Sequence, residues 1–147
     1  MIILIKHAGG GVGVMHASPE QEESALSAYA DKWAGTDFAY ISHRKIGEGE
    51  IPPDRTFRNA WVDSGEKIVQ DMPKCREIWR NRLRELRGPK FEPLERAQRT
   101  ALASGNMVEA RRLEVELQKL RDVTADPAIE AAATPEQLKA VMPTILA

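Results

Sequence analysis

A run of glycines near the N-terminus is the first feature of the sequence that could bind a ligand. The four glycines within 9–13 would let backbone amides approach a phosphate group closely. A dinucleotide-binding fingerprint, however, needs a further glycine at the position of His16 and a helix directly after the run. Residues from Val12 onward instead have the character of a strand. We therefore interpret the run as the turn of a β-hairpin between strands at 2–7 and 12–16, and we predict no nucleotide cofactor.

Metal binding would require several ligands close together, and the candidate ligands are scattered along the chain. Imidazole and thiolate groups are the common zinc ligands, and the sequence offers His7, His16, His43 and Cys75. No two of these have the short spacing of a metal motif. As the single cysteine, Cys75 cannot form an internal disulfide, and its place on the apolar stripe of a predicted helix favours a buried structural role. We predict neither a metal nor any other cofactor.

No group of residues is typical of a catalytic centre. The G-x-S-x-G turn that presents the nucleophile of serine hydrolases is missing from the sequence. Glu48 and Glu50 form a pair of carboxylates, but they lie in a segment rich in glycine and proline. Such a loop favours solvation over the burial that general acid catalysis uses. We therefore predict that the protein is not an enzyme.

The charge of the chain is uneven. Residues 1–73 hold 7 basic and 11 acidic side chains, whereas residues 74–91 hold 7 basic and 2 acidic ones. The basic patch comprises Lys74, Arg76, Arg80, Arg84 and Arg87, with Arg82 and Lys90 beside them. Arginines on one helix could bind phosphates and give salt-dependent binding to nucleic acid. Glu77 and Glu85 lie among them, so a solvated or acid-pairing face is the other interpretation.

Three further segments complete the N-terminal half. Ser18, Pro19 and Gln21 make a capping box, which predicts a helix from about residue 19 to Trp33. Alternation over 38–42 predicts a third strand, and a proline-marked turn follows it. Residues 55–62 are expected to be extended, with a short partner segment at 66–69.

The C-terminal half is predicted to be helical. Asp71 is a plausible cap for a helix whose apolar residues recur at spacings of three and four, and Gly88-Pro89 and Pro93 should kink or break it. A turn at 104–106 and a helix at 108–121 then predict a helical hairpin. An amphipathic hairpin cannot bury its stripe alone, so its leucines should pack within the chain or form a homo-oligomer. Two caps before prolines, at 126–127 and 134–135, predict short helices.

These elements predict an α+β fold, with a small N-terminal hairpin, helix and strand before an elongated α-helical hairpin and short C-terminal helices. We expect three regions: an α+β head at 1–71, amphipathic helices at 72–122, and a tail punctuated by alanine and proline at 123–147. The chain of 147 residues has a net charge of −1, which gives no general reason to expect nucleic acid or an anionic membrane as partner. Its longest apolar run, 1–5, is too short to span a bilayer.

Three segments resemble proteins of tailed bacteriophages and prophages. Residues 51–61, IPPDRTFRNAW, resemble a signature of small proteins encoded among tail and tail-fibre genes, whose chains also open with a hairpin containing a Gly-Gly turn. Residues 71–87, DMPKCREIWRNRLRELR, extend the similarity, although Cys75 stands where a small residue is usual. Residues 120–143, LRDVTADPAIEAAATPEQLKAVMP, are similar to the ends of phage tail-assembly and tail-fibre-assembly chaperones.

The resemblance implies a non-enzymatic, tail-associated accessory or structural protein that binds tail or tail-fibre subunits, in the virion or during assembly in the host cytoplasm. Aromatic and arginine side chains dominate interface hot spots, which nominates Arg55, Phe57, Arg58 and Trp61 as partner-binding residues. Phe57 and Trp61 are large enough to fill the core instead. The alternative function is a nucleic-acid-binding regulator that uses the arginine-rich helix.

Overall fold

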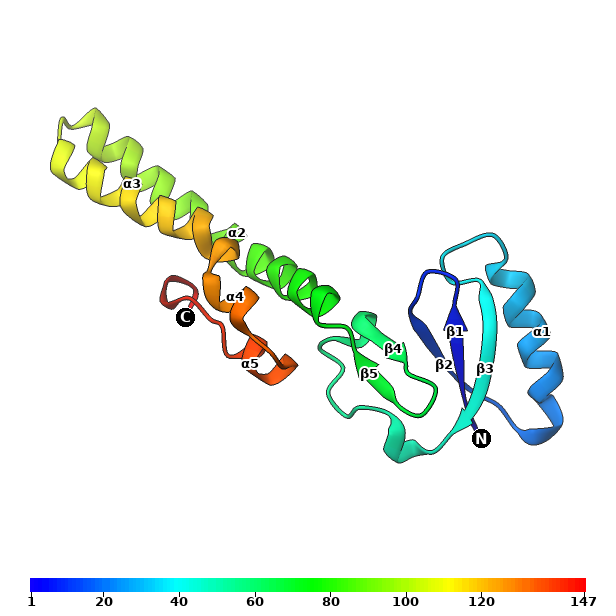
Figure 1. Cartoon of the computed structure of the whole chain (residues 1–147). Helices are drawn as coiled ribbons and strands as arrows, with labels where there is room; N and C mark the ends of the chain where they lie inside the picture. Colours follow the sequence, from blue (N-terminus) through cyan, green and yellow to red (C-terminus); the bar gives the residue numbers. More distant parts are fainter. The chain divides into compact units, whose positions relative to one another are not determined.

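The computed structural model describes residues 1–147, and its fold is α+β, as the sequence predicts. The chain divides into two compact units, Met1–Lys74 and Cys75–Ala147. The first unit holds five strands and a helix, whereas the second is helical (Figure 1). The helical hairpin and the C-terminal segment that follows it therefore belong to the same unit.

The first unit is built on a three-stranded antiparallel sheet of order β2-β1-β3. Its strands are β1 Ile2–His7, β2 Val12–His16 and β3 Tyr40–Ile46. The hairpin predicted from the glycine run is confirmed, because β1 pairs with β2 and His7 N donates to the carbonyl of Gly11 at 2.9 Å. Gly10 has a φ of 87°, a conformation that glycine adopts without a steric penalty.

Both faces of β1 are covered, which explains why the strand is almost entirely apolar. On one face lies a second sheet, the hairpin of β4 Trp61–Asp63 and β5 Ile68–Gln70. The two sheets share an apolar cluster of Ile2, Leu4, Ile46, Trp61 and Ile68. This cluster forms the core of that side of the first unit.

On the other face lies α1, Glu22–Trp33, which runs beside β3 (Figure 1). The Tyr29 hydroxyl hydrogen-bonds with Nε2 of His7 at 2.5 Å. A Cβ added at Gly13 would lie only 2.9 Å from that same nitrogen, so the imidazole needs a glycine beneath it. The glycine within β2 thus serves close packing under α1.

Three local predictions for the first unit need correction. The third strand occupies 40–46 rather than 38–42. Residues 55–60 do not extend, because Thr56 N donates to the Asp54 carboxylate and a 3₁₀ turn at Arg58–Ala60 bends the chain before β4 begins. The Ser18 side chain does not cap a helix: its hydroxyl donates to Gln21 Oε1 at 3.2 Å, and a 3₁₀ turn at Pro19–Gln21 precedes α1.

The predicted helical hairpin of the second unit is formed by α2, Met72–Ala103, and α3, Met107–Arg121 (Figure 1). The expected cap is present, since the Asp71 carboxylate accepts from Lys74 N at 3.3 Å. A positive φ of 72° at Gly105 lets the chain reverse between the two helices. Their apolar sides meet in a cluster of Leu94, Ala101, Ala110 and Leu113.

The sequence predicted a kink or a break of the helix at the prolines. The predicted break is wrong, because α2 continues through Pro89 and Pro93. Each proline leaves one carbonyl of the preceding turn without its amide donor. Contacts with α3 flank this stretch on both sides. Gln98 donates to Glu114 at 2.8 Å, and Arg87 donates to the carbonyl of Arg121 at 2.7 Å.

The two short C-terminal helices are confirmed as α4, Pro127–Ala131, and α5, Pro135–Lys139. Asp126 accepts from Ala128 N, and Thr134 accepts from Gln137 N, so both predicted caps are in place. The leucines Leu117 and Leu120 of α3 are buried, and so are Val123, Leu138 and Val141 of the segment that follows α3. The predicted stripe on α3 is therefore buried within the chain.

Candidate protein-interaction surfaces

The segment nominated for partner binding divides into two exposed and two buried side chains. Arg55 and Arg58 are exposed, as expected. Phe57 and Trp61 are each only 2% exposed, so the expectation that they lie on the surface is wrong and the core interpretation holds. Trp61 packs in the cluster between the two sheets, but its Nε1 has no hydrogen-bond partner.

The arginines of the basic patch bind groups within their own chain. Arg76 donates from Nη2 to the carbonyl of Ala132 at 3.0 Å and from Nε to the carbonyl of Ile129 at 3.3 Å. Arg80 donates to the carbonyl of Thr124 and to the Glu130 carboxylate, and this contact lowers the pKa of Glu130. These carbonyls lie at the ends of short helical turns, where no amide of the helix can reach them. The arginines therefore hold the C-terminal segment in place.

The remaining members of the basic patch do not form one free cationic face. Arg84 donates to Glu77 at 3.1 Å and also to the side chain of Asn81. The Arg87 guanidinium, besides its bond to α3, lies 5.9 Å from the ring centroid of Phe91. Lys74 belongs to the first unit, whereas the arginines of the patch belong to the second. These contacts favour the acid-pairing interpretation of the patch over a phosphate-binding one.

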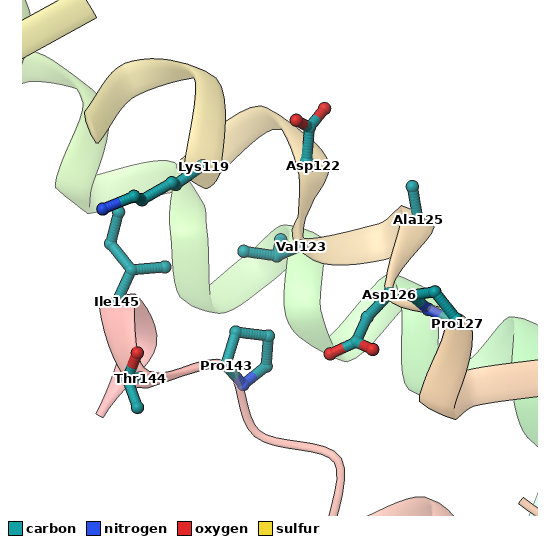
Figure 2. A pocket seen from close by; sticks show the side chains of 9 residues that line it. All are labelled: Lys119, Asp122, Val123, Ala125, Asp126, Pro127, Pro143, Thr144 and Ile145. Carbon is teal, nitrogen blue, oxygen red and sulfur yellow. The ribbon is translucent and has the colours of Figure 1, made fainter. Parts of the chain in front are cut away.

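A groove of about 510 Å³ opens in the second unit, between the end of α3 and the last residues of the chain. We call it the C-terminal groove. Figure 2 shows Val123 at its centre and Pro143 and Ile145 on the opposite wall. The charged side chains at its edges are Lys119, Asp122 and Asp126, and the Asp126 carboxylate points toward Pro143 (Figure 2). The Asp122 carboxylate points away from Pro143 and Ile145 (Figure 2), so Asp126 is the carboxylate that faces the groove.

Hydrogen bonds fix the charged residues of the groove. Asp126 accepts from Ala128 N at 2.9 Å through Oδ1, and Asp122 accepts from Gln118 at 2.9 Å, also through Oδ1. Lys119 donates to Glu116 at 2.8 Å. The lysine charge is therefore matched by a carboxylate outside the groove lining.

The turn of the helical hairpin carries exposed apolar side chains, which we call the hairpin tip. Leu102 and Met107 are each 50% exposed, and Val108 is 83% exposed. All three lie within one turn of Gly105. Exposed apolar surface of this kind is a candidate site for contact with another protein.

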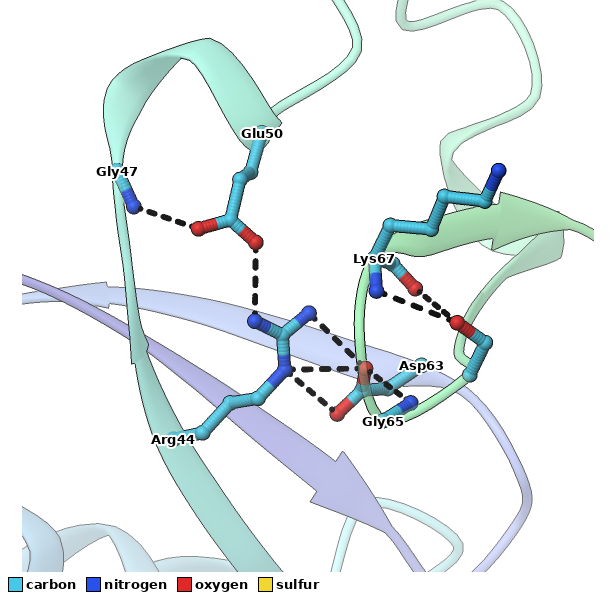
Figure 3. Close-up of polar contacts among 7 residues, drawn as sticks. Arg44, Gly47, Glu50, Asp63, Gly65 and Lys67 are labelled. Carbon is cyan, nitrogen blue, oxygen red and sulfur yellow. Dashed lines mark hydrogen bonds and ion pairs between the residues drawn. The ribbon is translucent and has the colours of Figure 1, made fainter.

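A polar network in the first unit links β3 to the β4–β5 hairpin (Figure 3). Arg44 donates to both carboxylate oxygens of Asp63 at 3.1 and 3.2 Å, and to Glu50 at 2.9 Å. The hydrogen bonds to Asp63 and then to Glu50 raise the pKa of Arg44. The hydrogen bond from the Gly47 amide, and to a smaller extent the one from Arg44, lowers the pKa of Glu50. The network leaves no carboxyl group suited to general acid catalysis.

Asp63 is the more buried of the two acids in this network, with a side chain 13% exposed. Burial by itself would raise its pKa, but the hydrogen bonds from Arg44 and from the Gly65 amide keep the pKa of Asp63 below its ordinary value. Three hydrogen bonds join the pair, since Arg44 Nε donates to both carboxylate oxygens and Nη2 donates to Oδ1. Multiple charge-assisted hydrogen bonds of this kind are among the strongest that arginine makes to carboxylates. We interpret the network as a structural link within the first unit.

The histidines do not come together in space. Burial lowers the pKa of His7 and raises the pKa of its partner Tyr29. His43 hydrogen-bonds with the Tyr40 hydroxyl at 2.8 Å, His16 is exposed at the end of β2, and Cys75 is buried in the other unit. The structure contains no group of three or more histidine, cysteine, aspartate or glutamate side chains placed to hold a metal ion.

Sequence reasoning missed both the C-terminal groove and the Arg44 network. The groove joins residues about twenty positions apart through loops of irregular geometry, and no periodic pattern predicts their meeting. The Arg44 network had a weak signal, since Arg44 precedes the apolar Ile46 by two residues and so lies on the same face of the strand, where a charge requires a partner. Sequence reasoning also missed the hairpin tip, although apolar residues on both sides of the turn were a signal for it.

Comparisons with known proteins add no assignment. No family model matches the chain, and no match was found among curated proteins or among solved structures. None of the helices has the length and apolar composition that crossing a bilayer requires. Function must therefore be argued from the residues themselves.

Proposed function

We propose that this chain is a non-enzymatic accessory or structural protein of a bacteriophage tail, which binds tail or tail-fibre subunits. The phage assignment rests on the resemblance of 51–61, 71–87 and 120–143 to proteins of the tail gene region. The binding role draws its support from the surface of the second unit. The single observation that carries it is the hairpin tip.

The hairpin tip supports binding because exposing apolar side chains to water is unfavourable. Val108, 83% exposed, would reduce its contact with water if another protein covered it, and so would Leu102 and Met107 beside it. A turn between helices accepts polar residues as readily as apolar ones, so folding does not require these three. A protein partner is the simplest occupant of such a site.

The alternative function, a nucleic-acid-binding regulator, draws no support from the arginine contacts. Arg76, Arg80 and Arg87 would have to leave carbonyl groups of their own chain to bind phosphates. Those carbonyls would then lose their charge-assisted donors, at a cost of about 1–3 kcal/mol each. We therefore retain the tail-associated role as the proposal.

The proposed place of action is the host cytoplasm during assembly, and the finished virion if the protein stays bound. Co-purification from infected or lysogenic cells should recover a tail or tail-fibre protein with the tagged chain. Mass spectrometry of purified particles then distinguishes a virion component from a transient assembly factor. Recovery of no tail protein under either condition would contradict the proposal.

The hairpin tip is tested by Val108→Lys, which should abolish capture of the partner while leaving the fold intact, because the side chain is already in water. The matched control is Ile41→Lys, which makes the same kind of change at a residue 55% exposed in the first unit. Duplex DNA provides the opposing test. Binding that falls by orders of magnitude with rising salt, without capture of a tail protein, would favour the regulator.

A further inference from the structure

The three-stranded sheet of the first unit ends in an open edge at β3. The order β2-β1-β3 makes β1 the central strand, and β3 pairs with β1 alone. The other edge strand, β2, lies next to β4, and its Val12 and Val14 pack against the cluster that contains Trp61. Five residues of β3 are exposed, although α1 lies nearby: Tyr40, Ile41, Ser42, His43 and Lys45. The outer edge of β3 is therefore not covered by the chain.

Hydrogen bonds at the ends of β1 fix the direction in which the backbone of β3 points. Ala17 N donates to the Met1 carbonyl at 3.1 Å, so the odd-numbered residues along β1 bond to β2. The even-numbered residues then bond to β3, and Ala8 N accordingly donates to the Ala39 carbonyl at 2.9 Å. Because bonding alternates along an antiparallel pair, every second residue of β3 bonds to β1, and the residues between them turn their N–H and C=O groups outward.

The outward-facing residues of β3 leave their backbone groups unpaired. Ser42 and Arg44 lie opposite even-numbered residues of β1 and therefore bond to it. Three residues turn outward instead: Ile41, His43 and Lys45. No other segment of the chain bonds to their N–H and C=O groups. A row of free backbone donors and acceptors matches one kind of protein partner, an extended strand.

β3 lacks the devices that protect many edge strands from pairing. Such strands are short, or they carry a proline, a bulge or a charged side chain. β3 has seven residues without a proline, and its one shift in register lies at its N-terminal end. Its charges are engaged within the chain. Lys45 pairs with Glu22 at 2.9 Å, and Arg44 pairs with Asp63 at 3.1 Å. These features favour pairing with another strand.

A second copy of β3 fits this edge. An antiparallel copy that overlaps the whole strand places His43 opposite its own counterpart, and Ile41 opposite Lys45. Outward-facing residues then meet outward-facing residues, so each free N–H and C=O gains a partner. No arginine or lysine lies opposite another, whereas registers centred on Arg44 or Lys45 would oppose like charges. We propose that the chain forms a symmetric dimer in which β3 pairs antiparallel with β3 of a second copy.

The dimer goes beyond the proposed function, because its interface lies in the first unit, whereas the hairpin tip belongs to the second. One pair of strands buries less than the roughly 1,200–2,000 Å² of stable interfaces, so the dimer should be transient. Sedimentation equilibrium of the full chain should therefore show an average mass that rises between about 0.05 mM and about 1 mM protein. The mass of a single chain at both concentrations would overturn the proposal.

Exchange of amide hydrogens with water locates the interface. In the ¹⁵N-labelled chain, the amides of Ile41, His43 and Lys45 should exchange about twofold more slowly once half of the chains are paired. The amides of Ser42 and Arg44, which already bond to β1, should not change. Association without slower exchange at the outward-facing amides would overturn the proposal. Slower exchange only after a tail protein is added would assign the edge to a strand of that protein, and would also overturn it.

The matched variants are His43→Pro and His16→Pro. Both histidines are exposed, and His16 lies opposite the even-numbered Ile2, so both turn their N–H away from β1. Proline is tolerated on an edge strand where the missing donor faces outward. His43→Pro removes the donor at the centre of the interface and should weaken the dimer about tenfold or more, whereas His16→Pro should dimerise normally. Unchanged association in His43→Pro, or an equal loss in both variants, would refute the β3 interface.

Two lysine substitutions separate the dimer from the proposed function. Ile41→Lys brings a second lysine opposite Lys45, which should weaken the dimer about fivefold and leave capture of a tail protein unchanged. Val108→Lys should abolish capture and leave the dimer unchanged. A dimer weakened by Val108→Lys but not by Ile41→Lys would place the interface at the hairpin tip and overturn the inference. A chain that dimerises through β3 but captures no tail protein would support the inference and contradict the proposed function.

Discussion

The two units each bury a tryptophan, and the two indoles differ in the hydrogen bonding of Nε1. Trp61 of the first unit is 2% exposed, and its Nε1 has no hydrogen-bond partner. Trp79 of the second unit is 7% exposed, and its Nε1 donates to the carbonyl of Val141 at 2.9 Å. The first indole contributes packing alone, whereas the second also ties the C-terminal segment to α2.

The arginines show the same difference between the units. Arg44 of the first unit binds two carboxylates, whereas Arg76 of the second binds two backbone carbonyls. Their side chains are similarly exposed, at 23% and 20%. Arg44 thus links a strand and loops of the first unit through ion pairs alone, whereas Arg76 binds the backbone of the C-terminal segment and adds only a longer ion pair to Glu130 at 3.9 Å.

The shortness of the C-terminal helices explains why arginines of the second unit bind the backbone. The last four carbonyls of any helix lack an amide donor, so a helix of five residues such as α4 or α5 leaves most of its carbonyls unsatisfied. Long donors from a neighbouring helix can supply the missing bonds. The strands of the first unit bond to one another and do not need such donors. Short helices therefore account for arginines that would otherwise suggest a nucleic-acid site.

The largest expected effect follows from removing a donor to the backbone. Arg76→Met should destabilise the second unit by about 2 kcal/mol, because two carbonyls lose a charged donor. Arg84→Met, whose guanidinium is 44% exposed and binds Glu77, should cost less than about 1 kcal/mol. Hydrogen exchange of α3 and α4 amides measures both. Equal costs would show that the carbonyl contacts do not hold the segment.

The tryptophan pair should give a smaller difference. Phenylalanine removes the same volume at both positions, so the cavity cost is similar. Trp79→Phe also leaves the Val141 carbonyl without its donor, whereas Trp61→Phe removes an N–H that has no partner. The free energy of opening should therefore fall about 1 kcal/mol more in Trp79→Phe than in Trp61→Phe. Hydrogen exchange of the amides in each unit measures the two losses of free energy. A larger loss in Trp61→Phe than in Trp79→Phe would contradict the role given to the Trp79 N–H.

The two kinds of arginine contact should also respond differently to pH. The folded-state pKa values of Glu50 and Asp63 are lowered, so Arg44 contributes stability above their unfolded values, about 4, and loses it as the pH falls. The stability difference between the natural chain and Arg44→Met should narrow from pH 6 to pH 3. The difference for Arg76→Met should narrow less, because two of its partners are carbonyls, which do not titrate, and its titrating partner Glu130 is exposed and lies 3.9 Å away. Urea unfolding at pH 6 and pH 3, followed by amide signals of each unit, measures the stability differences of both variants.

The sequence predicted what depends on local pattern. The hairpin followed from glycines between two strands, and the caps at Asp126 and Thr134 followed from an oxygen before a proline. Predictions failed where tertiary contacts outweigh local preference. Pro89 and Pro93 should disrupt a helix, yet α3 packs alongside α2 on both sides of them.

The interaction surfaces were harder to predict for a related reason. Phe57 and Trp61 have the composition of an interface, but side-chain type cannot distinguish an interface from a core, since both bury aromatic residues. The arginines of α2 are close in sequence, whereas the carbonyls they bind lie 34 to 56 positions away. Periodicity does not reveal a partner at that separation.

The smallest expected effect concerns His7, a buried histidine of the first unit. Burial holds its folded-state pKa below the ordinary 6.5, so the unfolded chain binds the proton more readily. Stability of the first unit should therefore decrease as the pH falls from 7.5 through 6.5 toward the lowered folded value, while the second unit, which has no histidine, should not change over this range. Hydrogen exchange of β1 and β3 amides, corrected for intrinsic rates, measures the effect against α3 amides. In His7→Gln the pH dependence of the first unit should disappear, whereas in His16→Gln, a change at an exposed residue, it should remain. If His7→Gln kept the full dependence, exposed histidines would account for it, and the contact between His7 and Tyr29 would carry no pH sensitivity.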